Sequence, residues 1–377
     1  MKIAILQPQM KDLGGAENVI LWMAESLSRK GHRIDIFSTC FNNSIVDSAS
    51  GFDNVRFIKI GVMKLSHAKT WKIWIMSFLL SFRLRNYDII NPHNYPTYYW
   101  LYLARKYFGL GIGRARVKWV CHEAFRLFWD TNIDHGIDAL KPAILKKRQD
   151  QDLKAVGQLD EIFANSPYTA QNIEHVYKRQ ARYNNIGVPL GKIYKTKKIS
   201  LGEEKNFGLI SRIERIKNLD TLLDVMKLLQ NKYDRRDIRL IVGGEGPHQP
   251  WLLKRIEEED IQHVVFKGRI PDKNVDDFYD NLRLVTYVPL YEPLGLISLE
   301  AGMRGKVVIG SSTGGPSYVI KDNETGFLVD SLRPDEIAEK ILSIIDDDEK
   351  LINMGIKARN RVFSNFDFEA FIGEFLK

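Results

Sequence analysis

The sequence predicts an α/β protein with two doubly wound, parallel-sheet domains, and three observations support that fold class. The chain has 377 residues, 44% of them hydrophobic, which is enough to bury two cores. Short apolar strand patterns alternate with amphipathic helix patterns along its length. Glycines, a proline and a run of lysines interrupt the alternation over residues 187–205, after which it starts again. Strands that alternate with helices favour a parallel sheet with right-handed crossovers.

The first predicted domain covers residues 1–190. It begins with an apolar strand at Lys2–Leu6, and a loop leads from this strand into a helix at about Ala16–Lys30. Gly31 is expected to end the helix, because glycine takes the left-handed conformation there without strain. Five further strands are predicted: His32–Thr39, Val55–Ile60, Asp88–His93, Arg116–Glu123 and Glu161–Ser166. A C-terminal helix at about residues 362–377 is expected to pack back on this domain.

The second predicted domain covers residues 191–361 and repeats the pattern. Asn206–Ile213 is a predicted strand, and Asn218–Lys232 is a predicted helix with apolar residues three and four apart. Four more strands are predicted: Ile238–Gly246, His263–Ile270, Arg283–Leu290 and Lys306–Ser312. Ligands of doubly wound sheets bind outside the carboxyl ends of the strands, so the loops at those ends are the candidate binding segments.

The positive charge of the chain is concentrated in its first half. The formal net charge is +8, yet residues 1–190 carry 26 Lys and Arg against 16 Asp and Glu, whereas residues 191–377 carry 29 against 31. From Arg56 to Lys118 there are 12 basic residues and one acid, Asp88. This asymmetry indicates that the first half faces an anionic partner, although a solubilising surface is the alternative.

Other functional classes find little support in the sequence. Cys40 and Cys121 show neither a pairing pattern nor a metal-ligand spacing, which is typical of buried thiols in a reducing compartment. The apolar run in residues 1–7 is too short for the core of a signal peptide. No recognised nucleic-acid motif accompanies the basic charge, so no nucleic-acid partner is expected. A basic polyanion-binding protein nevertheless stays the alternative from a different functional class.

The most informative stretch is Pro289–Gly302, which contains two glutamates, Glu292 and Glu300, separated by seven residues. A helix should start within it, with Gly295 leaving the first backbone N–H groups open to a diphosphate. Glu292 would then lie near a sugar beyond the phosphates, and Glu300 could accept hydrogen bonds from ribose hydroxyls. Two acids at this spacing also occur by chance, so the surrounding motifs decide its weight.

Those motifs resemble glycosyltransferase family 4, a group of retaining enzymes with the GT-B fold. The resemblance covers nearly all of the chain and is carried by these segments: EPLGLISLEAG, GGAEN (Gly14–Asn18), CHE (Cys121–Glu123), NSPYT (Asn165–Thr169), SRIERIKN (Ser211–Asn218), GGEGP (Gly243–Pro247), FKGRI (Phe266–Ile270), STGGPSYVI (Ser312–Ile320) and ETGFLV (Glu324–Val329). It implies two Rossmann-like domains facing a cleft, with a nucleotide-sugar donor bound by residues 191–361 and the acceptor by residues 1–190.

The resemblance also assigns roles in donor binding. Arg212 and Lys217 are expected to neutralise the diphosphate, and fixed cations there would stabilise the departing phosphate. Gly244 allows a close backbone approach to the ligand, and main-chain groups of Arg269 and Ile270 line the base. The remaining expected donor contacts come from the segment at the helix start: Glu292, Leu294, Gly295, Leu296 and Glu300.

In the first domain, the resemblance points to a glycine pair and a histidine. Gly14 and Gly15 are expected to close over the sugar and phosphate, although a simple strand-to-helix turn is the alternative. His122 ends a predicted strand and is expected to reach the transferred sugar; a hydrogen-bonded core histidine is its alternative. His93, which also ends a strand, is the weaker candidate.

The expected chemistry is retaining hexosyl transfer in which the departing phosphate takes the acceptor proton, with Glu292, His122, Arg212 and Lys217 as the catalytic candidates. No Asp-x-Asp element suited to a metal-bound nucleotide is evident, so neither metal nor cofactor is expected. The donor is expected to be UDP- or GDP-linked and the acceptor a glycan or lipid-linked molecule, in the synthesis of a cell-surface polysaccharide or glycoconjugate. A sugar phosphorylase or a nucleotide-sugar epimerase is the alternative enzyme.

A membrane contact is the last prediction. The charge-free run Ile73–Phe82 is too short to span a bilayer. Trp71 and Trp74 lie at one end of it, and Arg83 and Arg85 follow it at the other. Aromatic and basic residues together suit the headgroups of an anionic membrane, which predicts a peripheral enzyme on the cytoplasmic face. A core helix flanked by surface charges is the alternative for this run.

Overall fold

The computed structural model describes residues 1–11, 14–61, 70–109, 115–123, 129, 142–183, 185–190 and 193–377, apart from the side chains of residues 70, 71 and 193. The chain divides into two compact units. Unit 1 comprises Met1–Asn184 together with Glu369–Lys377, and unit 2 comprises Asn185–Phe368. The domain boundaries expected from the sequence, after residues 190 and 361, lie a few residues from this division.

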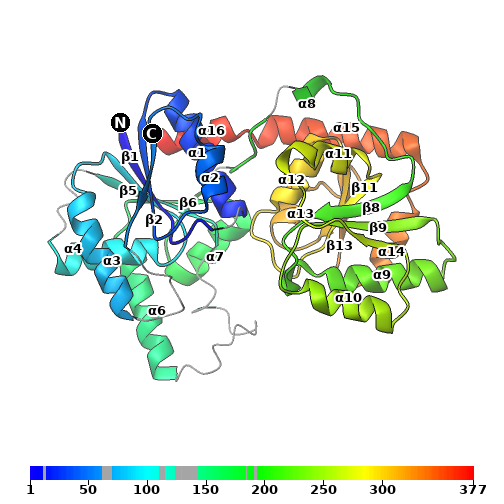
Figure 1. The fold of residues 1–377 in the computed structure, drawn as a ribbon, viewed down its shortest axis with the longest axis horizontal. Helices are drawn as coiled ribbons and strands as arrows, with labels where there is room; N and C mark the ends of the chain where they lie inside the picture. Colours follow the sequence, from blue (N-terminus) through cyan, green and yellow to red (C-terminus); the bar gives the residue numbers. More distant parts are fainter. Residues whose placement is uncertain are drawn as a thin grey trace. The chain divides into compact units, whose positions relative to one another are not determined.

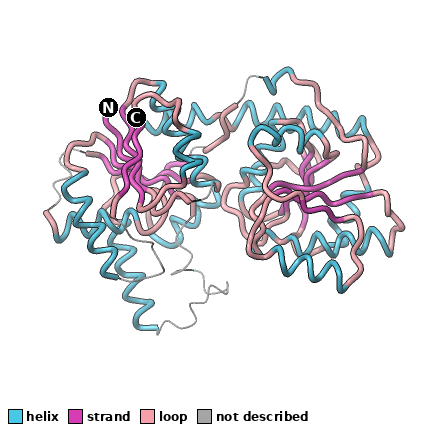
Figure 2. Tube along the Cα trace, viewed as in Figure 1, coloured by secondary structure: helices cyan, strands magenta, loops and turns pink. Residues whose placement is uncertain are grey.

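Unit 1 is built on a seven-stranded parallel sheet with the order β3-β2-β1-β4-β5-β6-β7. Its strands are β1 (Lys2–Leu6), β2 (Arg33–Ser38), β3 (Val55–Lys59), β4 (Ile89–Pro92), β5 (Arg116–Cys121), β6 (Glu161–Ala164) and β7 (Arg182–Tyr183). Helices surround this sheet (Figures 1 and 2): α1 (Gly15–Arg29), α2 (Asn43–Ser48), α3 (Thr70–Arg83), α4 (Thr97–Tyr107), α6 (Pro142–Val156), α7 (Pro167–Tyr177) and α16 (Phe368–Leu376). All six strands predicted for this half are confirmed.

The last helix, α16, packs against the sheet of unit 1 through a buried lysine. Lys118 on β5 is fully buried, and its Nζ donates a hydrogen bond of 2.8 Å to the carbonyl oxygen of Phe375. The same ammonium lies 3.2 Å from Glu161. Burial lowers the pKa of Lys118, although the Glu161 carboxylate opposes that shift. The rings of Phe371 and Phe375 contact Phe163 on β6 and complete the apolar packing.

Unit 2 is built on a six-stranded parallel sheet with the order β10-β9-β8-β11-β12-β13. Its strands are β8 (Lys205–Ile210), β9 (Ile238–Gly243), β10 (Val264–Phe266), β11 (Leu284–Tyr287), β12 (Val307–Ser311) and β13 (Gly326–Val329). In Figure 1, α9 (Leu219–Asn231) and α10 (Gln249–Glu258) cover one face of the sheet, and α12 (Leu296–Met303) and α15 (Asp348–Asn365) cover the other. Further helices are α8 (Ile193–Thr196), α11 (Val275–Asp280), α13 (Gly315–Val319) and α14 (Pro334–Leu342).

The topology of unit 2 reverses between β8 and β11. These two strands are neighbours in the sheet, but β9 and β10 continue from β8 to one side and β12 and β13 from β11 to the other. The loops after β8 and β11 therefore diverge from one point, which is where doubly wound folds bind their ligands. A backbone hydrogen bond of 3.0 Å from Leu290 to Ile216 joins the two loops.

None of the helices in the described part of the chain combines the length and the apolar character that a membrane span needs.

Candidate active site

Lys217, Tyr287 and Glu292 form a hydrogen-bonded cluster where the topology of unit 2 reverses. The Nζ of Lys217 lies 2.8 Å from Oε2 of Glu292 and 3.2 Å from the hydroxyl of Tyr287. The Tyr287 hydroxyl also donates a hydrogen bond to Oε2 of Glu292. The side chains of Lys217 and Glu292 remain 21% and 15% exposed, so the cluster is largely desolvated but open to a ligand.

The local backbone conformation fixes the position of Lys217. Arg215–Lys217 forms a single 3-10 turn, and Asn218 ends it in the left-handed conformation with φ 59°. The Asn218 amide donates hydrogen bonds of 2.9 and 2.8 Å to the carbonyl oxygens of Val288 and Ser331. An asparagine suits this position because it tolerates the left-handed region and also supplies donors. This turn therefore directs Lys217 towards the loop after β11.

The cluster determines the charge of its members. Burial raises the pKa of Glu292, but the Lys217 ammonium and hydrogen bonds from Lys217, Tyr287 and the Gly295 amide outweigh burial, so this pKa lies below its ordinary value. Burial and the Glu292 charge together raise the pKa of Tyr287 well above its ordinary value. At neutral pH Glu292 is therefore an anion and Tyr287 a neutral donor.

The α12 helix begins beside Glu292, as the sequence predicts. Gly295 is its N-cap with φ +80°, a conformation that glycine adopts without strain, and no side chain caps the helix. The Gly295 amide donates to Oε1 of Glu292 at 3.3 Å, and the Gly315 amide donates to the Glu292 carbonyl oxygen at 2.7 Å. The half-exposed Leu296 and buried Leu294 flank this terminus, whose dipole favours an anion.

Glu300 lies in the middle of α12 and differs from Glu292 in its electrostatics. Burial raises the pKa of its carboxyl, although the Arg304 guanidinium and the Tyr279 hydroxyl oppose that shift. Arg304 itself is engaged elsewhere, because it donates to the Glu300 carbonyl oxygen and pairs with Asp276. Burial thus disfavours the ionised form of the Glu300 carboxyl, and hydroxyl groups of a ligand could donate hydrogen bonds that stabilise that form.

Arg212 differs from Lys217 in its surroundings. Its side chain is 60% exposed, and its guanidinium pairs with Glu214 at 3.0 Å. Among the described residues, the structure records no contact of Arg212 with Lys217 or Glu292. The sequence assigned both cations to one diphosphate, but the structure brings only Lys217 to Glu292.

The loop after β9 approaches the loop after β8 through Gly244. Its φ is +112°, and a methyl group on it would lie 1.9 Å from the Ser211 carbonyl oxygen, so only glycine fits. The Gly244 amide donates to the Gly268 carbonyl oxygen at 2.7 Å, which joins this loop to the segment after β10. Arg269 in that segment is exposed, whereas Ile270 is half-buried and packs against the core.

In unit 1, the predicted histidine His122 directly follows the end of β5. Its Nε2 is 2.8 Å from Nδ1 of His93, which follows the neighbouring strand β4, and the two rings stack at 5.1 Å. His93 is fully buried, and its Nε2 lies 2.8 Å from Oδ1 of Asn91. Burial lowers the pKa of His122 to about 4, so this ring is neutral at pH 7.

The predicted glycine pair lies at the start of α1. Gly14 is its N-cap in an extended conformation, and Gly15 is its first residue. Gln7, which follows β1 and is almost fully buried, donates a hydrogen bond of 2.8 Å to Glu17 in the first turn of this helix. The helix N-terminus therefore carries a carboxylate of the chain itself.

Sequence reasoning did not single out Tyr287 and did not foresee the contact between His93 and His122. Tyr287 is the last residue of the apolar strand β11, where an aromatic residue is an ordinary core residue, so its pattern carries no signal. His93 was named from its place at the end of a predicted strand, but that place does not reveal its partner. Its contact with His122 requires the knowledge that β4 and β5 are neighbours.

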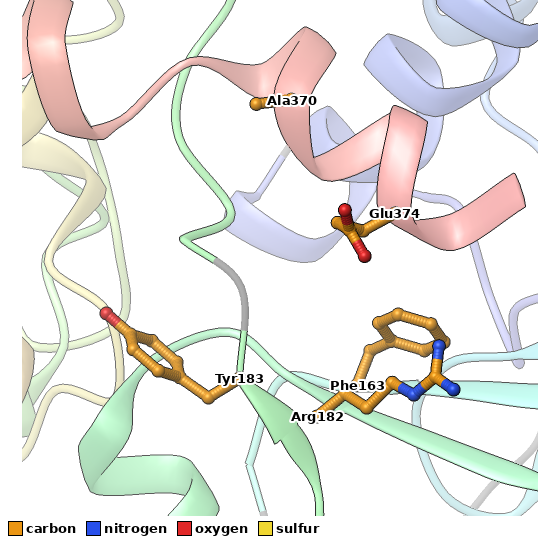
Figure 3. A pocket seen from close by; sticks show the side chains of 5 residues that line it. All are labelled: Phe163, Arg182, Tyr183, Ala370 and Glu374. Carbon is orange, nitrogen blue, oxygen red and sulfur yellow. The ribbon is translucent and has the colours of Figure 1, made fainter. Parts of the chain in front are cut away.

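A surface pocket of unit 1 lies away from all of these residues. It is lined by Phe163, Arg182, Tyr183, Ala370 and Glu374, where α16 passes over β6 and β7 (Figure 3). Arg182 pairs with Glu161 at 3.0 Å, so its charge is already neutralised. No predicted site residue lines this pocket. Among the described residues, moreover, no three His, Cys, Asp or Glu side chains gather as metal ligands would.

Comparison with known proteins places the chain in a family. Residues 13–185 match the family described as Glycosyltransferase Family 4, and residues 193–361 match the family described as Glycosyl transferases group 1. The poly(ribitol-phosphate) alpha-N-acetylglucosaminyltransferase of Staphylococcus aureus is 30% identical over 177 residues, which are 46% of this chain but only 35% of that protein. The D-inositol 3-phosphate glycosyltransferase of Corynebacterium glutamicum is 23% identical over 386 residues, covering 93% of this chain and 87% of that one.

A solved structure has the same fold as this chain. The Anabaena protein HepE in complex with UDP and glucose is similar over 100% of this chain and 98% of its own, with a TM-score of 0.77 and 17% identity. This likeness shows the fold, in which two parallel-sheet α/β units follow one another as they do here. The chain therefore belongs to the family 4 glycosyltransferases and is a glycosyltransferase with the GT-B fold.

Proposed function

We propose that the protein is a retaining hexosyltransferase that needs no metal and takes its sugar from a UDP- or GDP-linked donor. The Lys217–Tyr287–Glu292 cluster beside the start of α12 carries this proposal. It combines a fixed cation and a helix N-terminus for the diphosphate with an ionised carboxylate for the sugar hydroxyls. Glu300 would accept hydrogen bonds from the ribose, and the exposed Arg212 would exchange Glu214 for a phosphate.

The surroundings of Glu292 support retention without a covalent intermediate. A glycosidase-type nucleophile needs a carboxylate oxygen free to attack the anomeric carbon. Oε2 of Glu292 already accepts hydrogen bonds from Lys217 and Tyr287, and Oε1 accepts one from the Gly295 amide. Front-face displacement, with the departing phosphate taking the acceptor proton, suits such a site because it needs only positioning and electrostatic stabilisation.

The acceptor is a glycan or a lipid-linked molecule in this proposal. Two relatives are named for phosphate-containing acceptors, poly(ribitol-phosphate) and D-inositol 3-phosphate. The excess of basic residues in the first half of the chain is compatible with an anionic acceptor or with an anionic surface that carries it. Synthesis of a cell-surface polysaccharide or glycoconjugate is the process that such a reaction would serve.

An aromatic and basic surface on unit 1, formed by α3 and the end of α4, supports a membrane-bound acceptor. Four large apolar side chains of α3 are exposed: Trp74 by 41%, Ile75 by 39%, Phe78 by 45% and Phe82 by 55%. Trp74 packs on Tyr107 at 4.8 Å between ring centres, and Arg85 lies over the ring of Phe82. Exposed aromatics among cations suit the headgroup region of an anionic bilayer, so the proposal includes peripheral binding to the cytoplasmic face of a membrane.

The donor and the reaction type are tested in two steps. A thermal-shift screen of UDP- and GDP-linked hexoses identifies the donor, because a ligand of the native state raises the melting temperature by mass action. Purified protein is then incubated with that donor, with and without acceptor, and the anomeric configuration of the product is read by NMR. A product with the donor's configuration is expected. A product with the inverted anomeric configuration would contradict retention. Release of the sugar that depends on added phosphate would indicate a phosphorylase. Isomerisation of the donor in the absence of acceptor would indicate an epimerase.

A further inference from the structure

Asn91, His93 and His122 form a hydrogen-bonded chain at the carboxyl ends of β4 and β5. The Asn91 side-chain amide donates to the Lys118 carbonyl oxygen at 2.5 Å. Its Oδ1 lies 2.8 Å from Nε2 of His93, and Nδ1 of His93 lies 2.8 Å from Nε2 of His122. This hydrogen-bonded chain runs from the Lys118 carbonyl oxygen in the sheet to the His122 imidazole.

The direction of each hydrogen bond follows from the first one. Because the Asn91 nitrogen donates to a carbonyl oxygen, its Oδ1 must be the atom that faces His93, and an oxygen of that kind only accepts. Nε2 of His93 therefore carries a proton. Burial keeps both imidazoles neutral by lowering their pKa, so Nδ1 of His93 is bare and accepts a hydrogen bond. Nε2 of His122 must be the donor, which leaves Nδ1 of His122 without a proton.

We infer that His93 is a positioning residue, which together with Asn91 holds His122 as the Nε2–H tautomer and presents its Nδ1 as an acceptor for a substrate hydroxyl. This inference rests on the proposed transfer reaction for the identity of the hydroxyl, which belongs to the sugar or to its acceptor. The tautomer itself rests on the hydrogen-bond geometry of the three side chains and on the burial that keeps both rings neutral.

The surroundings of the two rings fit these roles. His93 is inaccessible to solvent, and its carbonyl oxygen accepts a hydrogen bond of 2.7 Å from Trp119, so it can act only through another residue. His122 is partly exposed, and Asn165 holds its carbonyl oxygen at 2.8 Å. Within the described part of the chain, the structure records no hydrogen bond to Nδ1 of His122. A hydroxyl group is the natural partner for a neutral, bare imidazole nitrogen, because it can donate.

The tautomer is tested in the wild-type protein without any substrate. The ¹⁵N shifts of histidine ring nitrogens distinguish a protonated from a bare nitrogen, and the spectra of His122→Ala and His93→Phe assign the two rings. At pH 7, His122 and His93 are both expected to carry the proton on Nε2. A proton on Nδ1 of either ring overturns the inference, whatever the enzyme's activity.

The positioning role is tested with two variants of His93. His93→Phe keeps the bulk of the ring but removes its donor and acceptor, so His122 should populate both tautomers and kcat should fall about tenfold at unchanged donor KM. His93→Gln keeps one donor and one acceptor and should recover part of the loss. A pure His122 Nε2–H tautomer in His93→Phe overturns the positioning role, as does an unchanged kcat in that variant.

The two hypotheses fail separately. If His122→Ala retains full turnover while the wild-type spectrum shows the Nε2–H tautomers, the substrate role of His122 fails and the hydrogen-bonded chain stands as a structural feature. If either ring carries its proton on Nδ1 but His122→Ala is inactive, the catalytic role stands and the positioning role of His93 fails.

Discussion

Two glutamates of one segment have pKa values shifted in opposite directions, and their substitution should therefore change stability in opposite directions. The pKa of Glu292 is lowered, so its ionised form contributes stability above about pH 4.3, and this contribution is lost as pH falls through the folded value. The pKa of Glu300 is raised, so ionisation costs stability above that raised value and the cost disappears as pH falls.

Glu292→Gln should lower, and Glu300→Gln should raise, the free energy of unfolding at pH 7. The loss at Glu292 should be about 1–3 kcal/mol, the usual cost of disrupting a buried charged hydrogen bond. Both differences should shrink in denaturation curves recorded near pH 4. Shifts of the same sign at pH 7 would contradict the opposite electrostatics of the two carboxyl groups.

The same two positions should differ in kinetics. Glu300→Ala should raise the apparent donor KM through lost ribose hydrogen bonds, whereas Glu292→Ala should mainly depress kcat because it acts near the sugar. Effects of roughly ten- to a hundredfold correspond to the loss of one charged hydrogen bond. Steady-state kinetics with the identified donor measure both, and full activity of the double variant would refute the site.

Lys217→Ala should weaken binding of the nucleoside diphosphate about tenfold or more while leaving binding of the bare nucleoside nearly unchanged, because the ammonium meets phosphate. Calorimetry with both ligands measures the difference. Lys227→Ala is the matched control, since Lys227 lies on α9 and pairs with Glu259 at the surface. Equal losses for nucleoside and diphosphate would mean that Lys217 acts through the fold.

At the scale of single elements, one side of α3 packs into the core of unit 1 and the other side exposes aromatic rings. Met76 and Leu80 are buried, whereas Trp74 and Phe78 are exposed. The core-helix alternative is thus correct for one side, and the membrane proposal depends on the other side. Phe78→Ser and Arg83→Glu should each reduce sedimentation with anionic vesicles at least several-fold without changing donor affinity.

Two controls sharpen this vesicle experiment. Trp251→Ser removes a tryptophan that is 55% exposed on α10 of unit 2, and it should leave vesicle binding unchanged. Rising salt should release the wild-type protein, because screening shortens the reach of the basic residues. If the wild-type protein does not bind anionic vesicles at low salt, the membrane contact is contradicted and a soluble acceptor becomes the better proposal. Lys69, a further basic residue just before α3, lies outside the described residues.

Most strands and the start of α12 could be predicted because they leave strong local patterns. The two missed strands are β7, with two residues, and β13, with four. A strand of two residues, such as β7, is too short to show a periodicity. The partnership of Lys217 with Glu292 spans 75 positions and depends on β8 and β11 being neighbours, which no local pattern reveals. The pairing of Arg212 with Glu214 went unpredicted because a side-chain rotamer decides it.

For the whole molecule, the proposed chemistry predicts activity without divalent metal. The cations that face the diphosphate are then side chains, Lys217 and Arg212, aided by the start of α12. Turnover measured after treatment with a chelator should equal that of the untreated enzyme within about twofold. A strict requirement for Mg²⁺ or Mn²⁺ would contradict this clamp and would require carboxylates to bind a metal with the nucleotide.

The contacts of the buried Lys118 with the last helix have a consequence for the order in which the two units fold during synthesis. The Lys118 ammonium donates a hydrogen bond to the Phe375 carbonyl oxygen, and the ring of Phe163 contacts the rings of Phe371 and Phe375. A ribosome produces all of unit 2 before it reaches α16, because unit 1 resumes only at Glu369. Until then the nascent first unit holds an uncovered lysine and an apolar edge. Unit 1 therefore completes its fold after unit 2 has emerged, and a chain cut before residue 368 should resemble a stalled folding intermediate.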